Sequence, residues 1–287
     1  MEIKDKLAVV TGAGSGIGRS LAQGFVERGA RLVVCTDLDG DNAAETATMI
    51  GEQAISAALD VGEEAAIEQL VQDIESQHGG IDIFVSNAGY GQGGGLNLPT
   101  EEWARMMNVH TWSHLAAARA VVPGMVQRGG GYILNTASAA GLLTQMDSGP
   151  YAVSKHAAVA FAEWLSINYA DQGIGVSVLC PQAVRTNIMA NSRPDKSRKD
   201  KPHKKESAGK AEQPADVKPS NTGQASGDGV LEPEAVADAC IQAIHDEQFL
   251  VLPHPEVLTY FQRKADDYDR WLAGMRRFKA RLTGQQA

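Results

Sequence analysis

Short apolar runs alternate with helical stretches along most of this sequence, and no other feature restricts the possible folds as strongly. The apolar runs are rich in Val and Ile, and they read "KLAVVTG", "RLVVCTD", "AISAALDV", "IDIFVSNAG", "GYILNTAS", "IGVSVLCP" and "FLVLP". Strands that are apolar almost throughout are buried on both faces, as in a parallel sheet that helices cover on both sides. The alternation therefore predicts a single α/β domain, residues 1–287, with one doubly wound, Rossmann-like parallel sheet.

Two segments depart from this alternation. Residues 191–229 lack Leu, Ile, Met, Phe, Trp and Tyr, so they cannot bury enough apolar surface to offset their ordering entropy, and we interpret them as a flexible polar insertion. Residues 255–287 repeat apolar residues at helical spacing and predict a C-terminal amphipathic helix. We expect its apolar stripe to dock on the domain or on a partner subunit, with binding to a membrane surface as the alternative. The stripe consists of Leu258, Phe261, Ala265, Tyr268, Leu272, Met275 and Leu282.

Charge and cysteine content exclude several classes of protein. The net charge is −9, and residues 191–210 alone carry +5 (eight Lys or Arg, three Asp or Glu), which leaves −14 on the remainder and argues against nucleic-acid binding. No apolar run approaches the roughly 18 residues of a membrane span, and "MEIKDKL" lacks the apolar core of a secretory signal. Because Cys35, Cys180 and Cys240 lie far apart and outside any CxxC pattern, we expect reduced thiols, no metal site and a cytoplasmic protein.

A glycine-rich segment, "TGAGSGIGRS", joins the first predicted strand to the first predicted helix. Gly12, Gly16 and Gly18 let the backbone turn tightly and approach a ligand, and the N–H groups at the start of the helix favour a pyrophosphate. Asp37 ends the second strand, where a carboxylate accepts hydrogen bonds from ribose hydroxyls and repels a 2′-phosphate. Together these residues predict a binding site for NAD; alone, Asp37 in "TDLDG" could equally be a turn residue.

The segment "PYAVSK" places a phenol and an ammonium four residues apart at the start of an Ala-rich run. Pro150 suits the first turn of a helix, and residues i and i+4 lie on the same helix face. A cation about 4 Å from the Tyr151 oxygen, at an effective dielectric constant near 20, would stabilise the phenolate by roughly 4 kcal/mol. We therefore expect Lys155 to lower the pKa of Tyr151 from about 10 to about 7, where a phenol can act as a base.

These motifs, with "NAG" at residues 87–89, Asn108 and Ser138, resemble the short-chain dehydrogenase/reductase superfamily of the Ser-Tyr-x-x-x-Lys type, from about Lys6 to Thr186. The resemblance implies that Tyr151 is the general acid/base and that Lys155 lowers its pKa and holds the nicotinamide ribose. It also implies that Ser138 orients the substrate oxygen and that Asn108 anchors a water on the proton path.

The resemblance further implies which residues contact NAD. Asp60 and Val61 would contact the adenine, residues 87–89 would form the wall under the adenosine ribose, and Thr186 would contact the nicotinamide carboxamide. The complete predicted set is Gly12, Ser15, Gly16, Ile17, Gly18, Asp37, Asp60, Val61, Asn87, Ala88, Gly89, Tyr151, Lys155, Pro181, Val184 and Thr186.

Three positions depart from the pattern of the superfamily. Ser86 stands where an Asn is usual, Gln182 where a Gly follows the proline, and Thr111 where a Gly follows the helix Asn. These changes affect loop geometry and packing, not the predicted catalytic residues. Three histidines flank the motifs and are interpreted as packing or helix-surface residues: His110, His114 and His156.

The predicted function is NAD-dependent interconversion of a secondary alcohol and a ketone. One alternative is an NADPH-dependent 3-oxoacyl-type ketoreductase, although such an enzyme would need a basic residue at Ser15 or Leu38; the other is a cofactor-binding protein without activity. The segment "FLVLPHPEV" is similar to a subgroup that acts on bulky apolar or aromatic secondary alcohols. The resemblance also implies a homodimer or homotetramer that pairs helices at about residues 100–126 and 151–171.

Overall fold

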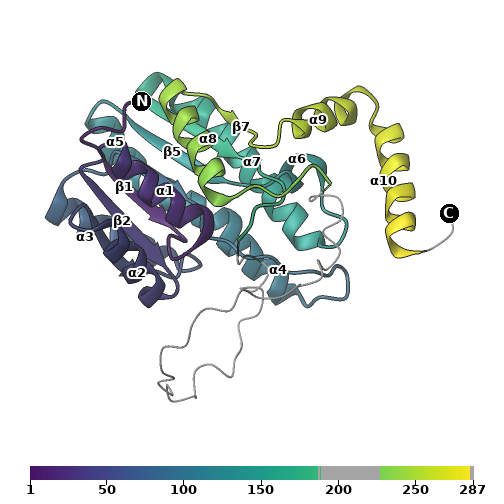
Figure 1. The fold of residues 1–287 in the computed structure, drawn as a ribbon, viewed down its shortest axis with the longest axis horizontal. Coiled ribbons are helices and arrows are strands. Elements are labelled where there is room, and N and C mark those ends of the chain that lie inside the picture. Colours follow the sequence, from purple (N-terminus) through teal and green to yellow (C-terminus); the bar gives the residue numbers. More distant parts are fainter. Residues whose placement is uncertain (187, 189–226, 285–287) are drawn as a thin grey trace, which may run out of the picture.

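A single sheet with helices on both faces forms the body of the molecule (Figure 1). The computed structural model describes residues 1–186, 188 and 227–284. Its seven strands pair in parallel in the order β3-β2-β1-β4-β5-β6-β7, which confirms the predicted doubly wound sheet. The strands are β1 (Leu7–Thr11), β2 (Leu32–Asp37), β3 (Ala54–Ala58), β4 (Ile83–Ser86), β5 (Gly131–Thr136), β6 (Ile174–Leu179) and β7 (Leu250–Val251).

Helices connect the strands and cover the sheet, because each parallel pair needs a crossover. They include a π-helical turn, η1, and a 3-10 turn, η2. The helices are α1 (Gly16–Glu27), α2 (Gly40–Ile50), α3 (Glu64–His78), α4 (Thr100–Met107), η1 (Asn108–Trp112), α5 (Ser113–Gln127), α6 (Ala140–Leu143), α7 (Gly149–Tyr169), η2 (Ala170–Gln172), α8 (Pro233–Asp246), α9 (Glu256–Asp266) and α10 (Tyr268–Thr283).

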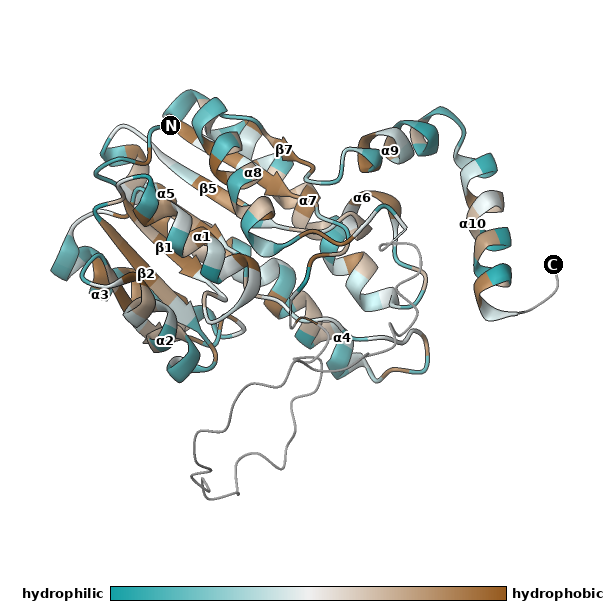
Figure 2. Cartoon of the chain, in the orientation of Figure 1, coloured by the Kyte–Doolittle hydropathy of each residue, from teal (hydrophilic) through white to brown (hydrophobic). Residues whose placement is uncertain are grey.

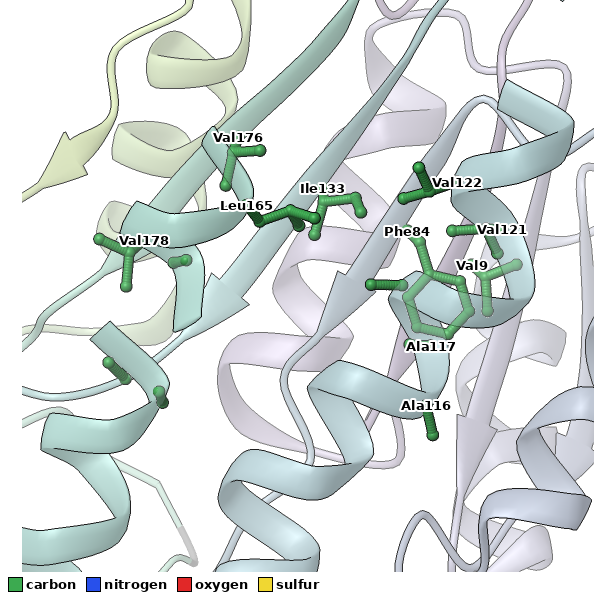
Figure 3. Close-up of a cluster of buried hydrophobic side chains, with 14 of the residues drawn as sticks. Val9, Phe84, Ala116, Ala117, Val121, Val122, Ile133, Leu165, Val176 and Val178 are labelled. Carbon is green, nitrogen blue, oxygen red and sulfur yellow. The ribbon is translucent and has the colours of Figure 1, made fainter. Parts of the chain in front are cut away.

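Side chains along each strand point alternately to the two faces of the sheet, and they form a separate hydrophobic core on each face. Val9 and Phe84 point to the face that α3, α5 and α7 cover, whereas Val10 and Val85 point to the face that α1 and α8 cover. Figure 3 shows the Phe84 ring among side chains from β1 and α5, and Figure 2 shows the apolar strands inside the more polar helices. The near-continuous apolarity of the strands thus follows from burial on both faces.

The chain changes direction in the sheet between β1 and β4. From β1 it winds outward through β2 to β3, and it then returns to place β4 on the other side of β1. The connections that leave the carboxyl ends of β1 and β4 therefore diverge and leave a crevice, the place where ligands bind in open α/β sheets.

The helix expected at about residues 100–126 is interrupted. It consists of α4, the π-helical η1 and α5, and the Ser113 N–H donates to the Asn108 carbonyl five residues back. Pro123 lies inside α5, which continues to Gln127. Burial of Val121, Val122 and Met125 against the sheet offsets the one backbone hydrogen bond that proline removes.

The C-terminal region is helical, but it forms two helices instead of one. Asp267 separates them, with φ −151° and ψ 93°, and its side chain accepts a hydrogen bond from the Arg270 N–H. Figure 1 shows α10 standing away from the sheet. Five members of the predicted stripe are 36–55% exposed, so docking of these side chains on a partner subunit stays a prediction. They are Leu258, Phe261, Tyr268, Leu272 and Leu282.

Most of the predicted polar insertion, residues 191–229, lies outside the described residues; only residues 227–229 lie within them. Among the helices that the structure describes, none has the length and apolar character that crossing a membrane would require.

Candidate active site

The glycine-rich segment forms the turn from β1 into α1. Gly12 and Gly16 have φ values of +67° and +51°, which side chains rarely adopt, and a Cβ on Gly18 would overlap the Gly12 carbonyl oxygen. Ser15 is the N-cap of α1, yet its side chain makes no capping hydrogen bond. The N–H groups of the first turn of α1 therefore lack a side-chain cap, and the helix dipole favours an anion there.

Asp37 lies at the carboxyl end of β2, beside that turn. Its Oδ2 accepts a hydrogen bond from the Gly14 N–H at 3.0 Å, and its Oδ1 accepts one from the Asp39 N–H at 3.1 Å. These bonds fix the carboxylate at the edge of a cleft, while the neighbouring Leu38 is 67% exposed. The remaining lone pairs of the carboxylate suit hydroxyl donors such as those of a ribose.

Arg19 is the cation closest in sequence to the glycine turn, and it is engaged within the protein. Its Nη2 lies 2.8 Å from the Glu45 carboxylate, and its Nε donates to the Thr46 hydroxyl at 2.9 Å. It also donates to the Gly14 carbonyl. The guanidinium is thus held by an acidic partner, which reduces its attraction for an additional phosphate.

Asn87 joins the carboxyl ends of three strands. Its N–H donates to the Thr11 hydroxyl at 2.9 Å, its Nδ2 donates to the Thr11 carbonyl at 3.0 Å, and its Oδ1 accepts from the Thr136 hydroxyl at 3.2 Å. These bonds hold residues 87–89 as one wall of the cleft. Ser86, where the superfamily has an Asn, is buried, and its hydroxyl has no partner among the described residues.

The predicted catalytic side chains approach the same cleft from three elements. Ser138 follows β5, and its Oγ accepts from the Ala140 N–H at 3.1 Å. Tyr151 lies in the first turn of α7, whose N-cap, Ser148, accepts from the Tyr151 N–H at 3.3 Å. The buried Lys155 follows one turn later, and Asn108, the first residue of η1, is exposed to the cleft.

The electrostatics of this group correct one expectation. Burial raises the pKa of Tyr151, and a hydrogen bond with Ser138 opposes that rise. The expected fall in the pKa of Tyr151 to about 7 is not found here, because burial of the phenol dominates; the Lys155 Nζ donates to the Thr136 carbonyl at 2.9 Å and lies 5.7 Å from the centre of the Tyr151 ring. Burial also lowers the pKa of Lys155 to about 8. The Lys155 ammonium therefore loses its proton more readily than a free lysine does, and it lies beside a Tyr151 phenol that keeps its proton.

One cleft of about 2230 Å³ contains nearly all the predicted site residues. Gly18 alone of the predicted set does not line it, because this residue packs α1 against the glycine turn. Among the described residues, no group of three His, Cys, Asp or Glu side chains could hold a metal ion. The three cysteines are free and buried, as predicted.

The other end of the cleft is lined by residues that carry no sequence signal. Tyr260 comes from α9, and its hydroxyl donates to Asp228, which also accepts from Gln182. The side chains at this end include Tyr90, Gln92, Arg105, Leu143, Gln145, Val230 and Tyr260.

The comparisons of this chain with known proteins agree with one another. The family model described as short chain dehydrogenase matches residues 6–197. A probable oxidoreductase, EphD, of Mycobacterium tuberculosis is 36% identical over 193 residues, which are 66% of this chain and 32% of that relative. A 1-deoxy-11-beta-hydroxypentalenate dehydrogenase of Streptomyces exfoliatus is 37% identical over 197 residues, 66% of this chain and 71% of the relative.

A solved structure supports the same relationship over the whole chain. A short chain dehydrogenase/reductase from Burkholderia phymatum, in complex with NAD, superposes with a TM-score of 0.79 at 29% identity. The superposition covers 94% of this chain and 96% of that one.

Proposed function

This chain belongs to the short-chain dehydrogenase family and is an oxidoreductase of that family, and from this premise we propose that it interconverts a secondary alcohol and a ketone with NAD. The observation that supports this most strongly is the convergence of Ser138, Tyr151 and Lys155 on the cleft that begins at the glycine turn and Asp37.

The residues present fit a bound dinucleotide. The glycine turn packs so closely against its neighbours that a Cβ at Gly12 or Gly16 would lie 2.9 Å from Ala88 or Thr186, and the first turn of α1 offers N–H groups without a side-chain cap. Asp37 would hold the adenosine ribose, residues 87–89 would line its wall, and Thr186 would hold the nicotinamide end. When bound, NAD would supply the hydride acceptor that the protein itself lacks.

Proton transfer is the task of this chain's own residues. In alcohol oxidation, the Tyr151 phenolate takes the hydroxyl proton of the substrate while Ser138 donates a hydrogen bond to the reacting oxygen. The positive charge of the buried Lys155, one helical turn away, would favour that phenolate when the cofactor is bound. Asn108, exposed to the cleft beside these groups, would hold a water that carries the proton away.

The preference for NAD follows from charge. At about 5 Å and an effective dielectric constant near 20, the Asp37 carboxylate opposes each negative charge of a 2′-phosphate by roughly 3 kcal/mol. Leu38 provides no cation, and Arg19 is paired with Glu45. The complex of the Burkholderia phymatum protein with NAD is consistent with this preference.

The substrate we propose is a bulky apolar or aromatic secondary alcohol. Leu143, Val230 and Tyr260 line the far end of the cleft, and apolar side chains of this kind bind apolar ligand surface. A panel of secondary alcohols of increasing size, assayed with NAD by absorbance of the reduced cofactor, tests this. Activity that is confined to small polar alcohols, or absent from the whole panel, would contradict the proposal.

We also propose that the protein is a homodimer or homotetramer in the cytoplasm. Large apolar side chains on α7 and at the end of η1 are half exposed or more, which supports pairing of these helices between subunits. They are Trp112, Val153, Trp164 and Ile167. Light scattering at micromolar concentration tests the assembly, and a monomer mass would refute it. The free thiols are consistent with a reducing compartment.

A further inference from the structure

His110, predicted as a packing residue, lies between the two walls of the cleft. His110 belongs to η1, and its side chain is fully buried. The Tyr90 N–H, from the loop after β4, donates to its Nε2 at 3.1 Å, and its Nδ1 lies 3.0 Å from the Ser154 hydroxyl of α7. The imidazole therefore bridges the loop after β4 and the helix that carries Tyr151.

The directions of these hydrogen bonds follow from the donors available. Because Nε2 accepts from a backbone N–H, the ring proton of neutral His110 resides on Nδ1 and is donated to Ser154 Oγ. The Ser154 hydroxyl then donates its own proton to the Tyr151 carbonyl oxygen at 3.1 Å. A protonated ring could not accept from Tyr90, and burial together with nearby Lys155 keeps the pKa of His110 well below its usual value.

Ring contacts connect the same residues. The His110 ring meets the Tyr151 ring edge-on at 87°, with 5.4 Å between centroids, and it lies 5.3 Å from the Tyr90 ring. A Cβ on Gly89 would lie 3.3 Å from His110 Nε2, so the loop fits closely over the imidazole. Edge-to-face aromatic contacts of this kind favour one ring orientation over others.

The next residue strengthens the connection. Thr111 stands where the superfamily resemblance predicts glycine, and its hydroxyl donates to the Ser154 carbonyl at 3.0 Å. Two consecutive residues of η1 thus bind one residue of α7, His110 through the Ser154 hydroxyl and Thr111 through the Ser154 carbonyl.

We propose that His110 is a positioning residue, which fixes Tyr151 relative to the Tyr90 loop in two ways: a relay of hydrogen bonds by way of Ser154 to the Tyr151 backbone carbonyl, and the edge-on contact with the phenol ring. It acts on the reaction only through Tyr151 and touches neither substrate nor cofactor. This inference rests on the proposed function, because it assigns His110 a role in positioning the acid/base of that reaction.

The first test compares kcat of His110→Phe, Ser154→Ala and the double variant. Phe keeps the ring and removes both hydrogen bonds, so we expect kcat to fall about 30-fold, and Ser154→Ala should lower it about tenfold. The double variant should equal His110→Phe within twofold, because one relay cannot be broken twice. The dissociation constant for NAD should change less than threefold in all three, since Asp37 and the glycine turn are unaffected.

His114→Phe is the matched control. His114 lies one turn further along, is equally buried, and its ring nitrogens have no partner among the described residues. It should keep kcat within threefold of the parent, so a fall in His110→Phe cannot be assigned to burying a larger ring. The inference is overturned if His110→Phe also stays within threefold, or if the double variant shows the product of the two single effects.

A measurement without turnover keeps the inference separate from the proposed function. Nitrogen-15 NMR of the histidine side chains in the parent protein should show His110 protonated at Nδ1 and not at Nε2 at neutral pH. In Ser154→Ala, the Nδ1 proton should exchange with solvent measurably faster. The opposite tautomer, or a doubly protonated ring, would overturn the relay even if the alcohol panel gives activity. The expected tautomer with an inactive panel would contradict the proposed function alone.

Discussion

The two ends of the cleft are built in different ways. The end at Asp37 is formed by backbone at the carboxyl ends of neighbouring strands, and each of its parts is contiguous in sequence. The end at Tyr260 is assembled from side chains of five separate segments of the chain. A site that is built from one turn and one strand end leaves a local pattern in the sequence. A site that forms where distant segments of the chain come together leaves no such pattern. Substitutions at the dinucleotide end should therefore have large effects on activity, and substitutions at the far end should have small ones.

The largest effect is expected between these two ends, at Tyr151. Tyr151→Phe removes the proton acceptor but keeps the ring that packs against His110, so the protein should fold and bind NAD. We expect kcat to fall by about 10³-fold, within the range for loss of a general acid/base. Steady-state kinetics measures this, with NAD binding by fluorescence as the control. Activity within tenfold of the parent would remove Tyr151 from its assigned role.

A smaller effect is expected from exchanging charge at the dinucleotide end. Asp37→Ala should narrow the preference for NAD mainly by weakening NAD binding, and Asp37→Ala with Leu38→Arg should invert it, a change of about a hundredfold or more in the ratio of specificity constants. Asp39→Ala is the matched control, because the Asp39 side chain caps α2 and should affect stability only. An unchanged ratio in the double variant would mean that Asp37 is only a turn residue.

At the far end, we expect a change of about tenfold or less. Tyr260→Ala removes a ring that lines the cleft and the hydrogen bond to Asp228, so the KM for a bulky alcohol should rise while NAD binding stays constant. Tyr268→Ala, in the exposed α10, is the control. If Tyr260→Ala weakened NAD binding more than alcohol binding, the division of the cleft into two ends would be wrong.

The smallest expected effect is on the stability of the fold, and it comes from the buried Lys155 of the catalytic group. Burial lowers the pKa of Lys155 to about 8 from 10.5, so the folded state holds this proton less tightly than the unfolded state. Between pH 8 and 10.5 the unfolded state binds more protons, so this group makes stability rise with pH across that window.

Lys155→Met removes the titration and the cost of a buried charge. The variant should be inactive, yet below pH 8 its free energy of unfolding should exceed that of the parent by about 1 kcal/mol, after allowing for the lost hydrogen bond to Thr136. Urea unfolding at pH 7 and pH 9.5 measures this, and the parent should be the more stable protein at the higher pH, because it gains about 2 kcal/mol between the two pH values. A parent that is more stable than Lys155→Met at pH 7 would contradict it.

The sequence predicted each part of the fold that depends on local pattern. All seven strands were predicted, and burial on both faces makes the five central ones, β2, β1, β4, β5 and β6, apolar almost throughout. The π-helical turn at Asn108 was not, since it spans a single short segment and no residue type marks such a turn in a sequence. The break at Asp267 was also missed, although a capping Asp there was a usable signal.

The candidate site divides in the same way. Gly12, Asp37 and Tyr151 were predicted because their chemistry needs a given residue at a given spacing. His110 was read as packing, because its partners, Tyr90 and Ser154, lie 20 and 44 residues away and no spacing rule connects them. The lowered pKa expected for Tyr151 was wrong for a similar reason: a four-residue spacing does not reveal how deeply the fold buries the phenol.

The most direct test of the account is the ratio of kcat/KM values for NAD and NADP, measured on the parent protein with one secondary alcohol that it turns over. The fixed Asp37 carboxylate and the pairing of Arg19 with Glu45 predict that NAD is preferred by about a hundredfold or more. Equal use of the two cofactors, or a preference for NADP, would contradict it.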